Sequence, residues 1–294
     1  MSVVPTALFR RDPGVLRAVH GAVPDVLLPA FEAVTHLGSP ATLAAVAWLA
    51  YLFGPSIGAL DRESAAHLLG VVVGGLALVT ALKWWFALPR PPTALRLAAT
   101  DGYGFPSGHA TASALGYGAI AATVRWGTLR HRAGVAAVLV VGISVSRVVL
   151  GLHYPVDVLV GAAVGTGYLA LASSTAAVDR RLPVLLAWTA AVLAALGVAA
   201  GAVAWPTPDG AAALGGAVGT AAGWVTIGRR DIAAGGDHVG RRAAAAGGIA
   251  LAAGGAWVLA PGPAIVAVTF AVCAAAAAAL PGLDLVGVAG AGDG

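Results

Sequence analysis

The sequence predicts an all-α membrane protein, a polytopic bundle of about eight to nine transmembrane helices preceded by an N-terminal interfacial helix. Apolar residues make up 59% of the 294 residues, charged residues make up 10%, and the mean hydropathy is +0.87. Soluble globular chains carry about 25% charged residues, so this composition excludes an ordinary soluble domain. The apolar segments are also long enough to cross a bilayer, which takes about 20 helical residues.

Nine apolar segments are candidate spans, and the last three are short and rich in glycine. They cover 40–59, 65–86, 107–126, 133–151, 155–176, 183–204, 210–228, 243–260 and 263–280. Residues 1–39 are more polar and are interrupted by prolines, which favours an interfacial segment over a span. The chain therefore divides into this N-terminal segment, a core at 40–178, additional helices of unassigned role at 179–282 and a C-terminal tail at 283–294.

Three short polar blocks stand at the ends of predicted spans. The first runs from Lys83 to Pro91, the second is Pro106-Ser107-Gly108-His109, and the third runs from Ser146 to Asp157. Lys83 is the only lysine in a chain whose other basic residues are all arginine. Counting the crossings between blocks places all three on one side of the membrane. We therefore expect them to form a single site.

The loops on the opposite side of the membrane are basic. Ten arginines lie there: Arg62, Arg125, Arg130, Arg132, Arg180, Arg181, Arg229, Arg230, Arg241 and Arg242. Basic loops stay in the cytoplasm, so we expect an integral protein of the cell membrane whose three blocks face outside the cytoplasm. Arg10, Arg11 and Arg17 are exceptions on the block side, offset by nearby carboxylates. This distribution explains the net charge of +4 without nucleic-acid binding.

The cations of the blocks suit a tetrahedral oxyanion. Lys83 and Arg90 are seven residues apart, about two helical turns, so a helix presents them on one face. Arg147 lies in an apolar run, where a charge is costly unless it faces a polar cavity or a partner. Arginine offers a planar fork and lysine a compact point charge, and both bind phosphate. The simpler alternative for Lys83 and Arg90 is that they reach the membrane interface.

The second block has the features of an anion-binding helix start. Ser107 is a natural N-cap, and Gly108 lets the backbone approach a ligand closely. The first-turn amides and the helix dipole favour an anion there. An ordinary capped helix start is the alternative. His109 follows at once and is placed to donate a proton to a leaving oxygen.

The third block supplies a histidine and a carboxylate. Pro155 predicts a helix start, which puts Asp157 in the first turn, within reach of His153. A carboxylate that holds one imidazole nitrogen leaves the other free as a nucleophile. Asp157 has a simpler alternative role, which is to stabilise the helix N-terminus. Zinc binding is disfavoured by the three nearby cations, so we expect neither a metal nor another cofactor.

Taken together, the three blocks resemble the signature of the type 2 phosphatidic acid phosphatase superfamily, which includes vanadium-dependent haloperoxidases and a glucose-6-phosphatase branch. The resemblance covers about residues 40–176. It implies a metal-independent enzyme in which His153 forms a phosphohistidine, Asp157 orients His153, and His109 is the general acid. The phosphate-binding residues that it implies are Lys83, Arg90, Ser107, Gly108 and Arg147.

The sequence thus predicts an integral membrane phosphatase that hydrolyses a phosphate monoester or diphosphate. The expected substrate is a lipid, such as phosphatidate, phosphatidylglycerol phosphate or a polyprenyl diphosphate, and membrane lipids are the expected partners. The alternatives are a lipid phosphotransferase, a glucose-6-phosphatase-like sugar phosphatase and a haloperoxidase. A transporter or scramblase is disfavoured because no second polar site lies across the bilayer. No oligomeric state is predicted.

Overall fold

The computed structural model is all-helical in the part of the chain that it describes, as the sequence predicts. The structure describes residues 11–98, 100–178, 192, 195–205, 207–231, 249 and 262–280. The predicted span at 243–260 and the tail at 283–294 therefore lie almost entirely outside the described residues. The main helices are α2 (Pro13–Ala22), α3 (Leu28–Leu37), α4 (Pro40–Phe53), α5 (Arg62–Phe86), α6 (Gly108–Thr123), α7 (Leu129–Val149), α8 (Pro155–Val178), α10 (Pro208–Asp231) and α12 (Pro263–Ala279).

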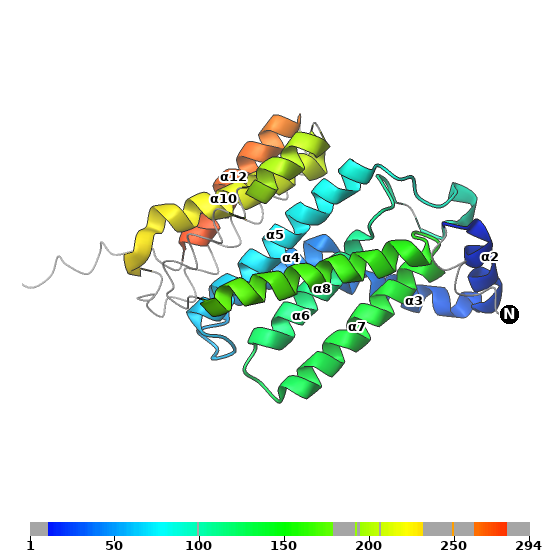
Figure 1. Ribbon diagram of the computed structural model, residues 1–294, viewed down its shortest axis with the longest axis horizontal. Coiled ribbons are helices and arrows are strands. Elements are labelled where there is room, and N and C mark those ends of the chain that lie inside the picture. Colours follow the sequence, from blue (N-terminus) through cyan, green and yellow to red (C-terminus); the bar gives the residue numbers. More distant parts are fainter. Residues whose placement is uncertain are drawn as a thin grey trace, which may run out of the picture.

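Helices α4 to α8 run side by side as a bundle (Figure 1). Helix α6 is central and packs against α5, α7 and α8. The short helices α2 and α3 lie at one end of the bundle beside α7, and α10 pairs with α12 along the other flank of α5. The end of the bundle where α2 meets the connection from α5 to α6 is its polar end.

Local capping explains how the N-terminal segment folds. The Asp12 side chain accepts a hydrogen bond from the Gly14 amide and caps α2, and the Ser39 side chain caps α4 ahead of Pro40. Helix α3 packs against α7. Together α3, with its preceding turn, and α4 are apolar enough to form one broken span, bent by 45° at the break. This part of the predicted interfacial segment therefore belongs to the bundle.

Three described helices are long and apolar enough to cross a membrane, namely α5, α7 and residues Pro155–Ser174 of α8. The broken α3–α4 pair raises this number to four. The predicted count of eight to nine spans is not confirmed. Helix α6 falls short because it has only 16 residues, Gly108–Thr123, and α12 has 17.

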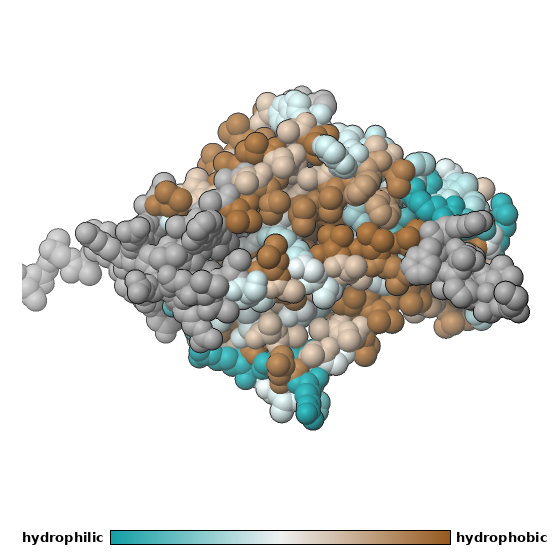
Figure 2. Space-filling model, in the orientation of Figure 1, coloured by the Kyte–Doolittle hydropathy of each residue, from teal (hydrophilic) through white to brown (hydrophobic). Residues whose placement is uncertain are grey.

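The outer surface agrees with a membrane setting. Figure 2 shows hydrophobic side chains across the middle of the molecule, with hydrophilic areas near α2 and near the turn between α6 and α7. Helix α7 contributes Val135, Val138 and Val141 to this surface, each more than half exposed. In water such an apolar surface would be unfavourable, whereas lipid tails would cover it.

Tyr51 of α4 connects the bundle to the C-terminal helices. Its hydroxyl donates a hydrogen bond to the carbonyl oxygen of Ala278 at 2.8 Å and accepts one from the Trp224 indole at 3.1 Å. Tyr51 is completely buried, and it packs with Leu69 and Leu115 in the main core. Helices α10 and α12 are therefore fixed to the same core as α4, α5 and α6.

Glycines on α8 allow its close approach to α6. A Cβ atom at Gly161 would lie 2.6 Å from the Ser107 carbonyl oxygen and 3.1 Å from the Thr111 hydroxyl, and one at Gly165 would meet the Thr111 carbonyl oxygen. These are mainly backbone atoms, which cannot turn away as a flexible side chain can. The Gly161-x3-Gly165 spacing thus serves packing within the chain, directly beneath the Ser107 cap.

We expect Gly161→Ala to lower the free energy of unfolding by about 1–3 kcal/mol, because the added methyl overpacks the α6–α8 contact. Thermal unfolding in detergent would measure this as a lower midpoint. Gly167→Ala on the same helix is the matched control, because a Cβ atom there meets nothing within 4 Å. Equal midpoints for the two variants would contradict the packing role of Gly161.

Candidate active site

The structure brings the three polar blocks together at the polar end of the bundle. Their eight predicted residues occupy helix ends and the connections between them. Lys83 is in the last turn of α5, Arg90 in the following connection, Ser107 at the cap of α6, Gly108 and His109 in its first turn, Arg147 in the last turn of α7, His153 between α7 and α8, and Asp157 in the first turn of α8. The predicted convergence on one end is therefore observed.

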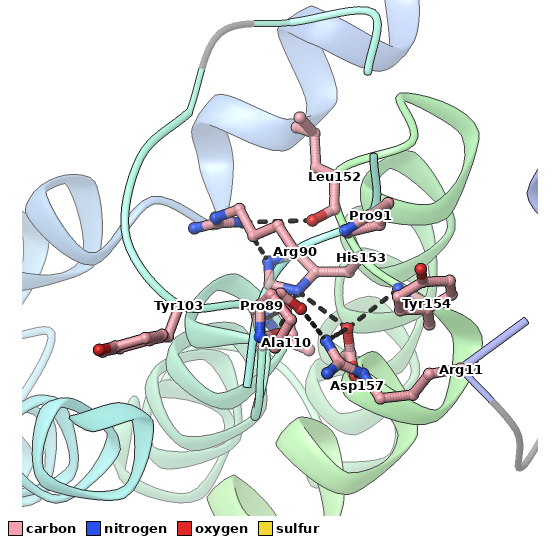
Figure 3. Close-up of polar contacts among 12 residues, drawn as sticks. Arg11, Pro89, Arg90, Pro91, Tyr103, Ala110, Leu152, His153, Tyr154 and Asp157 are labelled. Atoms are coloured by element: carbon pink, nitrogen blue, oxygen red, sulfur yellow. Dashed lines mark hydrogen bonds and ion pairs between the residues drawn. The ribbon is translucent and has the colours of Figure 1, made fainter. Parts of the chain in front are cut away.

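The hydrogen bonds of His153 fix its tautomer. Its Nδ1 atom lies 2.7 Å from the Gly104 carbonyl oxygen, and its Nε2 atom lies 3.1 Å from an Arg90 guanidinium nitrogen (Figure 3). A carbonyl oxygen only accepts and a guanidinium only donates hydrogen bonds. Nδ1 therefore carries the proton, and Nε2 carries the lone pair. This is the form of the imidazole that can attack an electrophile.

The surroundings of His153 also keep the ring neutral. The side chain is 1% exposed. Burial, together with the positive charges of Arg90, Arg147 and Lys83, lowers the pKa of His153 well below its usual value. A lowered pKa favours the neutral ring, which keeps its lone pair.

Asp157 lies next to His153 but is not its nearest partner. The distance from Asp157 Oδ2 to His153 Nδ1 is 3.6 Å, longer than the hydrogen bond from Nδ1 to Gly104. Oδ2 also accepts a hydrogen bond from the Tyr154 amide at 3.0 Å, which is the helix-stabilising role that the sequence left open. The backbone oxygen of Asp157 accepts a bond from the Ser107 amide. Asp157 thus joins the second and third blocks.

Arg11 is a member of the site that the sequence did not predict. Its Nε atom lies 3.1 Å from Asp157 Oδ1, and one of its terminal nitrogens donates to the Pro89 carbonyl oxygen. Figure 3 shows the guanidinium directed at the Asp157 carboxylate beside Tyr154. One signal in the sequence was available, because Arg11 is among the few arginines on the side opposite the basic loops.

Arg147 is buried, and a hydrogen bond holds one end of its guanidinium. It is 4% exposed, and one terminal nitrogen donates a hydrogen bond to the Thr35 hydroxyl at 2.9 Å. Its Nε atom is buried and has no hydrogen-bond partner among the residues that the structure describes. A buried donor of this kind costs free energy unless it is satisfied, and a phosphate oxygen would satisfy it.

Lys83 lies over the start of α6. Its Nζ atom donates to the Tyr103 carbonyl oxygen at 3.3 Å, and its Cε atom lies 3.3 Å from where a Cβ atom on Gly108 would stand. A side chain at position 108 would therefore crowd the lysine. The absence of a side chain keeps the ammonium group close to the first-turn amides of α6, where an anion is favoured.

Arg90 fixes the connection between α5 and α6. Its Nε atom donates to the carbonyl oxygens of Asp101 and Gly102, and a terminal nitrogen donates to that of Leu152 at 3.2 Å. Burial and the nearby charge of Arg96 lower the pKa of Arg90 to about 10. The guanidinium therefore remains protonated at neutral pH.

His109 is half-buried in the first turn of α6, within electrostatic range of Arg147, Lys83 and Arg90. It shares the start of α6 with Ser107, whose side chain caps the helix by accepting from the Ala110 amide at 3.4 Å. Across the described residues, no three His, Cys, Asp or Glu side chains gather as a metal site would require. Metal independence stays a prediction.

The comparison with known protein families identifies this group of residues. The model of the PAP2 superfamily matches residues 64–181, which contain all eight predicted site residues. This stretch of the chain is therefore similar to the PAP2 superfamily. The PAP2 match confirms the resemblance seen in the sequence, and it excludes the N-terminal segment and most of the C-terminal helices. No curated protein matches the chain.

Two solved structures are similar to this chain. One is the first transmembrane PAP2 type phosphatidylglycerolphosphate phosphatase from Bacillus subtilis, with 26% identity, a TM-score of 0.48, and coverage of 60% of this chain and 87% of that chain. The other is LpxE from Aquifex aeolicus, with 23% identity, a TM-score of 0.46, and coverage of 59% and 99%.

Proposed function

We propose that this protein is a membrane phosphatase of the PAP2 superfamily that hydrolyses a lipid phosphate monoester or diphosphate through a phosphohistidine on His153, outside the cytoplasm. The observation that carries the proposal is the state of His153. The Gly104 carbonyl holds the proton on Nδ1, which leaves a lone pair on Nε2. Three cations, Lys83, Arg90 and Arg147, surround that nitrogen and favour a phosphate beside it.

The first chemical step forms a bond between His153 Nε2 and phosphorus, and it breaks the bond from phosphorus to the leaving oxygen. His109 donates a proton to that oxygen. The charge of the substrate phosphate offsets the positive field around His109 and so favours its protonated form. In the second step water attacks phosphorus, the nitrogen–phosphorus bond breaks, and His109 accepts the proton from water. The products are inorganic phosphate and the alcohol from a monoester, or inorganic phosphate and the lipid monophosphate from a diphosphate.

In this scheme Arg90 first covers the lone pair of His153 and then binds the substrate phosphate. Its guanidinium donates to Nε2 of His153 at 3.1 Å, so it covers the lone pair. A charged phosphate oxygen is a stronger acceptor than a neutral imidazole. Substrate binding therefore draws the guanidinium onto the phosphate and releases Nε2 for attack.

Aromatic side chains at the end of α5 support a lipid substrate. Trp85 is 74% exposed and Phe86 is nearly half exposed, just after Lys83. Phe86 also makes an edge contact with Phe105, with ring centroids 5.2 Å apart. Tryptophan and other aromatic residues favour the membrane interface. A head group can thus reach the cations while its tails stay in the bilayer.

The test is release of inorganic phosphate by the purified protein in the presence of EDTA. The panel contains phosphatidate, phosphatidylglycerol phosphate, a polyprenyl diphosphate and glucose 6-phosphate. We expect turnover of at least one lipid and little of the sugar phosphate. Transfer of phosphate to an added lipid alcohol would identify a phosphotransferase instead. Lipid flipping in liposomes without phosphate release would contradict the proposal.

We expect Trp85→Ala to raise KM for a long-chain lipid phosphate in vesicles about fivefold, the equivalent of about 1 kcal/mol. A short-chain, water-soluble analogue should show an unchanged KM, because it does not use the membrane anchor. Trp126→Ala is the matched control, since Trp126 is 61% exposed but follows α6 at the opposite end of the bundle. If both substrates respond equally to Trp85→Ala, the residue has no role in lipid entry.

A further inference from the structure

The N-terminal segment, residues 11–38, contacts the active site although the PAP2 match begins only at residue 64. It does so at two separate points. Arg11, just before α2, binds Asp157, and Thr35 of α3 binds Arg147. One contact reaches the residue beside the nucleophile, and the other reaches a phosphate-binding cation.

The contact of Arg11 with Asp157 engages the whole carboxylate. Arg11 Nε lies 3.1 Å from Oδ1, and a terminal nitrogen lies 3.4 Å from Oδ2. The guanidinium is fixed further by the Pro89 carbonyl oxygen and by the Tyr154 ring, whose centroid lies 5.0 Å from the guanidinium carbon. The Asp157 side chain is fully buried. A buried carboxylate needs a partner of opposite charge, and Arg11 provides that partner.

The contact of Thr35 with Arg147 is equally enclosed. Thr35 is 7% exposed, and its hydroxyl accepts a hydrogen bond from Arg147 at 2.9 Å. Within the described part of the chain this is the hydrogen bond that orients the Arg147 guanidinium. Because the guanidinium is planar, fixing one nitrogen limits where the others point. The Nε atom that lacks a described partner is held within the same plane.

We propose that the N-terminal segment is a functional part of the active site, in which Arg11 positions Asp157 and Thr35 positions Arg147. This inference rests on the proposed phosphatase function and adds two positioning residues to it. The segment does more than cover the bundle, because each contact sets the charge or the direction of a group next to the phosphate.

The role of Arg11 has a consequence for pH dependence. The titratable and charged groups of the site around His153 are Lys83 of α5, Arg90 of the following connection, His109 of α6, Arg147 of α7 and Asp157 of α8, with Arg11 behind Asp157. Removing Arg11 removes one positive charge from this group. Without Arg11 the buried Asp157 carboxylate loses its partner of opposite charge and takes up a proton more readily, so catalysis should fail at a higher pH on the acid side.

The first experiment therefore compares pH profiles of kcat/KM for phosphate release. We expect Arg11→Gln to move the acid limb upward by about 0.5–1 pH unit. Arg11→Lys, which keeps the charge, should restore the limb. Arg17→Gln is the matched control, because Arg17 is an exposed arginine of α2 and its replacement should leave the profile unchanged. If kcat/KM of Arg11→Gln falls at the same acidic pH as that of the wild type, the role of Arg11 is overturned, whatever the maximum kcat/KM of the variant.

The second experiment measures anion affinity with orthovanadate, a tetrahedral phosphate analogue, by calorimetry. We expect Thr35→Val to weaken binding about tenfold, because Arg147 loses the acceptor that orients it. Thr35→Ser keeps the hydroxyl and should bind as the wild type does. Equal affinity for Thr35→Val and the wild type would remove Thr35 from the proposal.

Orthovanadate binding also separates this proposal from the phosphatase function. If the wild type releases no phosphate, the phosphatase function fails, and the positioning roles are then decided by binding alone. The positioning roles would be supported by a loss of orthovanadate affinity in Thr35→Val and by an upward pH shift of orthovanadate binding in Arg11→Gln. Unchanged binding in both variants would overturn them.

Discussion

His153→Ala is expected to lower kcat for phosphate release by at least about 10⁴-fold, because the variant has no atom that can replace Nε2 as the nucleophile. The structure gives the reason for so large an effect. Nε2 is the nitrogen with the lone pair, and it lies among the cations that would hold the phosphate. Turnover is measured with the preferred lipid of the substrate panel, in EDTA.

A matched control for His153→Ala is His131→Ala. His131 is exposed near the start of α7, at the other end of the bundle, and it bonds to the Thr128 hydroxyl. Its replacement should leave kcat within about twofold, as for a surface substitution. An acid-labile phosphoryl group on the peptide containing His153, detected by mass spectrometry, would identify the intermediate. Substantial turnover by a folded His153→Ala protein would refute nucleophilic catalysis by this residue.

Arg147→Lys should lower kcat/KM about 10²-fold even though it preserves the charge. Arginine donates to the Thr35 hydroxyl with one nitrogen and keeps others for the phosphate. A lysine has one nitrogen and no planar fork, so it cannot serve both partners with the same geometry. Loss of one well-placed donor to the transition state typically costs 10²–10³ in rate.

Arg132→Lys is the control for this substitution on the same helix. Arg132 lies near the start of α7 and donates to the carbonyl oxygens of Ala121, Trp126 and Gly127, far from the site. Its replacement should affect stability slightly and leave kcat/KM within about twofold. If the two variants lose activity equally, the Arg147 guanidinium has no special role.

The convergence of the three blocks was predictable from the sequence because it follows from helix periodicity and length. Apolar runs at 65–86, 133–151 and 155–176 correspond closely to α5, α7 and α8. Once these helices alternate in direction, the polar residues at their ends must share one end of the bundle. The Ser107 cap was also predictable from the sequence, because a serine before an apolar run predicts a helix start.

Two features of the site were hidden for physical reasons. The partner of His153 Nδ1 is the Gly104 carbonyl oxygen, and every residue carries such an oxygen, so the sequence cannot mark it. Arg11 is 146 residues from Asp157 along the chain, and no periodicity relates them. The expectation that Asp157 holds His153 directly came from their spacing of four residues, which does not reveal a competing arginine.

The number of spans was the least predictable property of the fold. The apolar segment at 107–126 predicts a full span, but the caps of α6 restrict this helix to 16 residues. Conversely, Leu28–Leu37 seemed too polar to enter the bundle, yet it packs on α7 and continues into α4 across a 45° bend. The length of α6 follows from its local caps, whereas the place of α3 is decided by packing on α7, which composition alone does not reveal.

The hydroxyl of Tyr51 sets a limit on how far this protein can be shortened. It is the point where the Trp224 indole and the Ala278 carbonyl meet the bundle. A protein that ended after α8 would leave that hydroxyl in an apolar interior without these two partners, which costs about 1–3 kcal/mol. Helices α10 and α12 thus contribute to the stability of the bundle that holds the site. We expect these two helices and helices α4 to α8 to unfold in a single transition.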